Sequence, residues 1–310
     1  MVRTGGLNNR NDHMYSSLKS CRALRLPLAA RLLHSLATVI TTIILLASTT
    51  LAQSPPGGLE LSANELARRV IANELKFQDD HDHWMYRQEK EEPGKKQIKE
   101  IVETKDGDLS RLISINGHPL TAQEQEKENQ RIQELVGSPG EQGKLQRARI
   151  LETERGKRLF KMLPDAFVFN YAGRGGALIK LSFRPNPNFQ PPSLEARVFH
   201  DMEGELWVDS KEERLAVLNG RLMEDVKLAG GLLGRLAKGG HFEVRQAEVA
   251  AGHWEMAGMT VDMKGKALFF KTTNVQQTEN RSDFERVPDD LTLTQAADIL
   301  NRQIVVAANR

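Results

Sequence analysis

The feature that most constrains the fold is a long region, from Pro164 to about Val287, in which apolar and polar residues alternate with a period of two. Glycine, asparagine and proline interrupt the alternation at short intervals, which is typical of antiparallel strands joined by tight turns. Because a sheet of about ten strands must curl, split or close, we expect one large curved sheet. The candidate strands are residues 166–171, 177–184, 195–201, 205–209, 214–219, 222–227, 241–248, 253–263, 266–276 and 278–286.

Helical patterns flank this region. Ser62 and Glu65 form a capping box ahead of apolar residues at helical spacing, which predicts the start of an amphipathic helix. Runs of strands with few helices predict an α+β fold, in which a curved antiparallel sheet carries helices on its concave face. The expected helices are residues 61–77 and 294–303, and further strands are expected from Trp84, over residues 97–104 and over residues 109–115.

A charged helical hairpin interrupts the strands at residues 121–163. Two capping boxes, Thr121 with Glu124 and Ser138 with Glu141, predict the starts of its two helices. The sequence leaves two interpretations of this hairpin open. It is either a solvated excursion held by ion pairs between neighbouring turns, or a lid or docking arm for a partner.

The first 52 residues have the layout of a secretory signal peptide. Basic residues precede an apolar run at residues 36–47, and Thr50-Leu51-Ala52 places small residues where a signal peptidase cuts. We therefore expect cleavage after Ala52, a flexible linker over residues 53–60, and export to the periplasm. An uncleaved anchor is the alternative, although the run is short for a membrane span of about 20 residues.

Loss of this leader changes the charge of the chain. The whole sequence has 43 basic and 41 acidic residues, whereas residues 53–310 have 37 and 40, a net charge of −3. A nearly neutral chain gives no electrostatic reason to expect a nucleic-acid partner. The only cysteine, Cys21, lies in the leader, so the exported chain has no disulfide, no thiol nucleophile and no cysteine ligand for a metal.

Three short segments carry a resemblance to a known family. They are the amphipathic helix at residues 61–77, the strand Gly204-Glu205-Leu206-Trp207-Val208-Asp209, and the late segment Arg281-Ser282-Asp283-Phe284. With them the chain resembles the LolA-like periplasmic lipoprotein carriers, the outer-membrane lipoprotein-sorting type, whose members place G-x-L-W-[VI]-D on a strand. The resemblance implies one domain over residues 61–310, an unclosed β-barrel with helices as a lid over an apolar cavity. Relative to that pattern, the hairpin 121–163 is an insertion.

Large apolar side chains on the expected strand faces are the candidate ligand-binding residues. On a curved sheet they would line a cavity for acyl chains, whose burial yields about 0.8 kcal/mol per methylene. The alternative is an ordinary filled core, because sequence does not show how well a sheet is filled. The candidate residues are Trp84, Tyr86, Phe167, Phe169, Tyr171, Leu181, Phe183 and Leu206.

The sequence gives little support for catalysis. A G-x-S-x-G nucleophile motif is absent from it, and so is a phosphate-binding loop. Residues 79–83 place two histidines and three carboxylates together, a set that would hold zinc or another divalent ion. The alternative is a solvated connector after the first helix, and this is the interpretation that we favour. We therefore expect a protein that is not an enzyme and that has no catalytic residue, no metal and no cofactor.

These observations lead to one main hypothesis and two others. The main one is an exported carrier that holds the acyl chains of a lipid or lipoprotein in an apolar half-barrel and has at most transient membrane contact. The second is a non-enzymatic envelope sensor or scaffold that binds another protein. The third is an envelope hydrolase with a metal at residues 79–83.

Overall fold

The computed structural model describes residues 61–77, 82–228, 234–267 and 271–308. The expected signal peptide 1–52 and the linker 53–60 lie outside the described residues. No helix in the described ranges is both long enough and apolar enough to cross a membrane.

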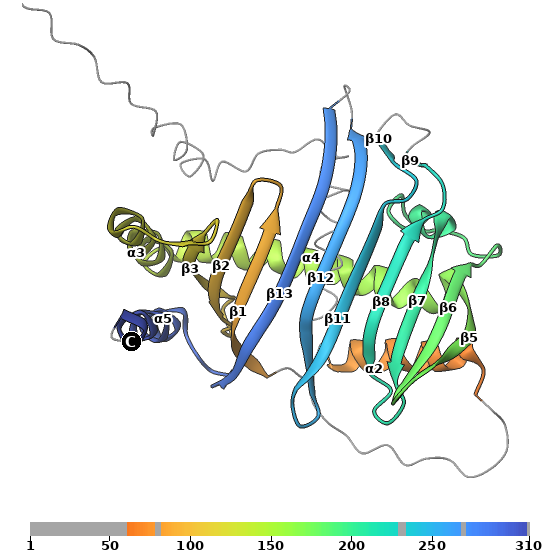
Figure 1. Cartoon of the computed structure of the whole chain (residues 1–310), viewed down its shortest axis with the longest axis horizontal. Coiled ribbons are helices and arrows are strands. Elements are labelled where there is room, and N and C mark those ends of the chain that lie inside the picture. The colour runs from red at the N-terminus through yellow and green to blue at the C-terminus, as the bar shows by residue number, and fades with distance from the viewer. Residues whose placement is uncertain (1–60, 78–81, 229–233, 268–270, 309–310) are drawn as a thin grey trace, which may run out of the picture.

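The described strands form a single antiparallel sheet that does not close into a barrel (Figure 1), which confirms the expected fold class. Along its main path the strand order is β4-β3-β2-β1-β13-β12-β11-β8-β7-β6-β5; off this path β10 pairs with β12, and β9 pairs with β10. The main path therefore ends at β4 and β5. The strands are β1 (His83–Glu92), β2 (Lys95–Val102), β3 (Leu109–Ile115), β4 (His118–Pro119), β5 (Phe167–Gly175), β6 (Leu178–Pro185), β7 (Met202–Asp209), β8 (Leu215–Leu222), β9 (Val226–Leu228), β10 (Gly234–Leu236), β11 (His241–Ala250), β12 (His253–Ala267) and β13 (Lys271–Val287).

Two helices, α2 (Ala63–Phe77) and α4 (Pro139–Ala166), cover one face of the sheet. In Figure 1, α4 crosses behind the strands while α2 lies behind the end that holds β5 and β6. Apolar residues of both helices join those of β5 to β8, β11 and β12 in the main core. The amphipathic helix expected at residues 61–77 thus buries its apolar side against this half of the sheet.

A second core lies at the other end of the sheet, where α3 (Ala122–Val136) and α5 (Leu293–Ala308) pack against β1, β2 and β3. Its centre includes Val102, Leu109, Ile132 and Leu300. The two helices of the expected hairpin therefore belong to different cores. The first stabilises the β1–β3 end, whereas the second extends across the sheet and reaches the main core.

Local signals place most element boundaries correctly. The capping box of Thr121 and Glu124 is formed in both directions at the start of α3. Asn116 and Gly117 both adopt positive φ, 52° and 82°, as the turn between β3 and β4 requires. The predicted box at Ser138 is wrong, because the side chain of Ser138 makes no cap hydrogen bond, but α4 does start at Pro139, directly after Ser138, as predicted.

Three strand predictions are also wrong. The strand expected at residues 222–227 does not form as one element, because β8 continues to Leu222 and β9 begins only at Val226. Residues 195–201 form a short 3₁₀ helix, η2 (Ala196–Asp201), because the Ser193 hydroxyl accepts from the Ala196 amide and turns the chain after the prolines. The break predicted between residues 276 and 278 does not exist. The whole of β13 is one strand, since it pairs along its length with β12 and then with β1.

A buried ion pair fixes α2 to the sheet. Glu74 of α2 accepts from Arg214 Nε at 2.8 Å, from the Leu215 amide at 2.9 Å and from Gln246 Nε2 at 3.1 Å. The side chains of Glu74 and Arg214 are 3 % and 1 % exposed. The Arg214 guanidinium also lies 4.1 Å from the ring centroid of Phe77 at the end of the same helix. The position of α2 is thus set by directional contacts as well as by apolar burial.

Glu74→Gln should lower the free energy of unfolding by about 3–5 kcal/mol, because it leaves Arg214 charged, buried and without its carboxylate. Urea denaturation measures this. Asp165→Asn is the matched control, since it breaks an α2–α4 ion pair to Arg68 in which both side chains are more than half exposed. That change should cost less than about 1 kcal/mol. Equal, small losses in the two variants would contradict the anchoring role of Glu74.

Candidate functional site

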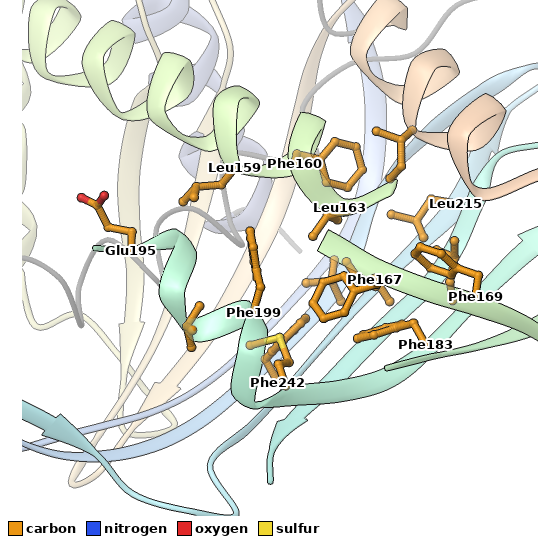
Figure 2. Close-up of a pocket in the computed structure, with 16 residues that line it drawn as sticks. Leu159, Phe160, Leu163, Phe167, Phe169, Phe183, Glu195, Phe199, Leu215 and Phe242 are labelled. Atoms are coloured by element: carbon orange, nitrogen blue, oxygen red, sulfur yellow. The ribbon is translucent and has the colours of Figure 1, made fainter. Parts of the chain in front are cut away.

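An apolar cavity lies between the sheet and the helices that cover it. Its open volume is about 60 Å³, and among the described residues on its wall Glu195 is the only charged one. Figure 2 shows the side chains that surround it, contributed by α2, α4, η2 and five strands. The lining residues are Ile71, Leu159, Phe160, Leu163, Phe167, Phe169, Phe183, Glu195, Val198, Phe199, Met202, Leu206, Leu215, Leu218, Phe242 and Val244.

Four phenylalanine rings form one side of this wall. Phe167 and Phe169 project from β5 to the same side because side chains alternate along a strand. Phe169 pairs directly with Phe183 of β6, and their ring centroids are 5.8 Å apart. The Phe167 ring lies 4.6 Å from that of Phe183 and 5.4 Å from that of Phe199 in η2. These tilted and edge-on contacts fix the rings and shape the cavity.

Glu195 lies at one end of the cavity, apart from the aromatic rings (Figure 2). Its carboxylate pairs with Arg155 of α4, and the two side chains are 27 % and 28 % exposed. Partial burial acts to raise the pKa of Glu195, but hydrogen bonds from Ser193 and Arg155 outweigh it, so the pKa is lowered. The cavity is therefore apolar along its length and polar where α4 meets η2.

The structure brings together four of the eight predicted ligand-binding residues. Phe167, Phe169, Phe183 and Leu206 line the cavity. A fifth, Leu181, is fully buried in the same core without reaching the cavity wall.

The other three residues lie elsewhere, so the expectation that all eight share one site is wrong. Tyr171 is 51 % exposed, and its hydroxyl donates to the Leu61 carbonyl at 2.7 Å. Trp84 and Tyr86 are buried in a separate cluster with Phe284, whose ring stacks on Tyr86 at 5.3 Å between centroids. They lie on β1, which β13 and β12 separate from β11, the nearest strand that contributes to the cavity wall.

Comparison with known proteins finds no matching family model, no matching curated protein and no matching solved structure. The LolA-like resemblance therefore stays a hypothesis.

Sequence reasoning missed the roof of the cavity. Leu159, Phe160 and Leu163 come from α4, and Val198 and Phe199 come from η2. The helical spacing of the first three is a signal of burial, but it does not say which part of the sheet they cover. The apolar pair Val198 and Phe199 was assigned to a strand, because two apolar residues that follow prolines are compatible with a strand as well as with a 3₁₀ turn.

A second cluster, of buried carboxyl groups, was also missed. Glu103 and Glu255 are 3 % and 2 % exposed, and one carboxyl oxygen of each has no hydrogen-bond partner. Burial, followed by the charge of Asp108, raises the pKa of Glu103 to about 8, although the Trp84 amide and Arg281 act in the opposite direction. Burial and the charge of Glu103 raise the pKa of Glu255 well above its ordinary value.

The structure tests the metal hypothesis only in part, because residues 79, 80 and 81 lie outside the described ranges. Asp82 and His83 are described and contact other polar side chains. Asp82 pairs with Arg286 and with His253, and His83 Nδ1 lies 3.4 Å from Asp289. In the described part of the chain, no group of three or more histidine, cysteine or carboxylate side chains is arranged to hold a metal ion.

The buried carboxyls should make stability depend on pH. The folded chain binds the Glu103 proton more tightly than the unfolded chain, in which the pKa is near 4.5. This contribution is complete below about pH 4.5 and is lost as the pH rises towards 8. Urea unfolding of the unmutated protein and Glu103→Gln between these two limits measures it. The variant should lose less stability as the pH rises and should be the more stable of the two at the upper limit.

Glu134→Gln, a change at an exposed carboxyl of α3, is the control and should keep the slope of the unmutated protein. The same pH slope in Glu103→Gln and in the unmutated protein would show that Glu103 is not the titrating group.

Proposed function

We propose that this chain is a non-catalytic carrier that binds the acyl chain of a lipid or lipoprotein in the cavity beneath α2 and α4. The observation that carries the proposal is the composition of the wall, on which fifteen of the sixteen described residues are apolar. An apolar cavity of this kind stays dry, so a hydrocarbon chain entering it displaces no bound water. Each methylene removed from solvent contributes about 0.8 kcal/mol.

The size of the cavity means that a ligand must widen it. About 60 Å³ of open volume holds only a small part of an acyl chain. The sheet cannot yield easily because its strands are paired on both sides around the cavity, from β6 to β11. The roof must therefore move, and the two helices that form it are held in different ways.

The roof helix that is easier to displace is α4. Its described ion pairs to its surroundings, Arg68–Asp165, Arg149–Asp108 and Arg155–Glu195, are all partly exposed, and such pairs contribute little to stability. Pro164, near its end, lacks the amide hydrogen that would bond back to the preceding turn. We propose that α4 bends near Pro164 to admit the ligand, while the buried Glu74 contacts keep α2 in place.

The rival hypothesis is a sensor or scaffold that binds another protein by the sheet edge or the helical hairpin, and one form of it, strand addition at β5, has less support. An open edge needs free amide and carbonyl groups. At β5 the side chain of Asn64 occupies both, since its Oδ1 accepts from the Phe169 amide at 3.0 Å and its Nδ2 donates to the Phe167 carbonyl at 3.5 Å. The first helix thus covers the start of this edge.

Val244→Phe should abolish binding of a fluorescent fatty-acid probe, because Val244 lies on the cavity wall and a ring there fills the open volume. The melting temperature should hold or rise, since the added ring replaces empty space. Val217→Phe is the matched control. Val217 is partly buried in a separate cluster with Trp207 and Trp254, so the same enlargement there should leave probe binding unchanged.

Bound ligand gives an independent test. Organic extraction of the protein purified from its own cell envelope, followed by mass spectrometry, should release acyl-containing molecules from the unmutated protein and far less from Val244→Phe. An empty unmutated protein that also fails to bind the probe, while Val244→Phe is stabilised, would mean a rigid packing defect and would end the carrier proposal.

A further inference from the structure

The outward side of α4 is strongly basic. Residues 144–161 contain seven basic and two acidic side chains, a net charge of +5, in a chain that is otherwise close to neutral. The preceding helix, α3, has four acidic and two basic residues. The positive charge is therefore a property of α4 and not of the hairpin as a whole.

The spacing of the basic residues along α4 places three of them on one side of the helix. Arg147, Leu151, Arg158 and Lys161 follow one another at intervals of four, seven and three, so they share the side of the helix opposite buried Gly156 and Phe160. All four are exposed. Within the described part of the chain, Arg147, Arg158 and Lys161 form no ion pair. Their charges are thus available to a partner.

Apolar side chains are exposed on the same stretch of helix. Leu151 is 70 % exposed and lies between Arg147 and Arg158, and Ile150 beside it is 54 % exposed. Among the residues whose side-chain exposure is described, the exposed large apolar side chains all come from α4 or from β5, the strand that follows it. A helix face that combines exposed leucine or isoleucine with several cations is the pattern of a helix that lies in a membrane interface.

We propose that the outer face of α4, defined by Arg147, Ile150, Leu151, Arg158 and Lys161, docks the protein on an anionic phospholipid surface. The three cations would lie at the level of the lipid phosphates, and Leu151 and Ile150 would enter the boundary between headgroups and acyl chains. A nucleic acid would satisfy the cations but would leave both apolar side chains against a charged backbone. The observations therefore favour a lipid surface.

The proposal does not depend on the carrier function, because the docking face and the cavity lie on opposite sides of α4. If both hold, the helix that roofs the cavity is also the part that touches the membrane, and docking would act directly on the roof. The two proposals are separated by their variants: Val244→Phe closes the cavity and leaves the outer face of α4 intact.

Sedimentation with lipid vesicles tests the docking. The full chain is expressed for the unmutated protein and for every variant, so that any removal of the leader is the same in all of them. At low salt the unmutated protein should bind phosphatidylcholine vesicles containing phosphatidylglycerol at least about tenfold more tightly than vesicles of phosphatidylcholine alone, and high salt should weaken this preference. Each basic residue near the surface contributes about fivefold, so the triple variant R147E/R158E/K161E should lose about 100-fold or more.

Two further variants make the result specific. The control K95E/K211E/K227E changes the net charge equally at exposed lysines outside α4, and it should keep most of the preference for anionic vesicles. Leu151→Gln should weaken binding to anionic vesicles about tenfold without changing the salt dependence, since it removes apolar insertion and no charge.

Three results would overturn the proposal. The first is equal binding to anionic and neutral vesicles, and the second is equal loss in the α4 triple variant and the lysine control. The third is tight binding of duplex DNA, sensitive to the α4 charges, by a protein that shows no vesicle binding.

Discussion

The buried contact between Glu74 and Arg214 fixes the geometry on which the cavity depends. Apolar burial holds a helix on a sheet but does not by itself set where along the sheet the helix lies, because it is not directional. Glu74 supplies that direction, since it bonds Arg214 and the Leu215 amide beside β8 and Gln246 on β11. Removing a charge pair from water costs free energy, which is offset only when the hydrogen bonds of the pair are well formed. These bonds form at one position of α2 on the sheet, so that position is favoured.

The two roof helices consequently have different freedom. For α2, the anchor is buried and shared among several groups of the sheet. For α4, the described ion pairs are exposed to water, and its own sequence includes Pro164 where it runs directly into β5. The same helix carries the exposed cations and apolar side chains. The cavity roof thus has a firmly anchored helix, α2, and a more weakly held helix, α4, which also carries the exposed cations and apolar side chains.

Between the two apolar cores, polar side chains are buried at a cost. Arg281 donates to Glu279 at 2.8 Å, lies 4.8 Å from the Tyr86 ring centroid and interacts electrostatically with Glu103 and Glu255. One oxygen of each of these two glutamates has no hydrogen-bond partner. A bulge near Asp283, whose φ is 55°, accompanies the cluster and shifts the β1–β13 register. Such contacts add little stability, but they penalise a slipped pairing of the central strands.

The sequence by itself determined most of the element types, most of their limits and the antiparallel class, because alternation, caps and turn residues act within a few positions of each other. It also marked Phe167, Phe169 and Phe183 as buried. Only the tertiary structure decided which apolar residues share a wall. Tyr171 has the same period as Phe169 on the same strand, yet it is half exposed, and its hydroxyl bonds the Leu61 carbonyl just before α2. Trp84 and Tyr86 fall outside the cavity because strand order depends on pairings between segments distant in sequence, and local pattern carries no information about those.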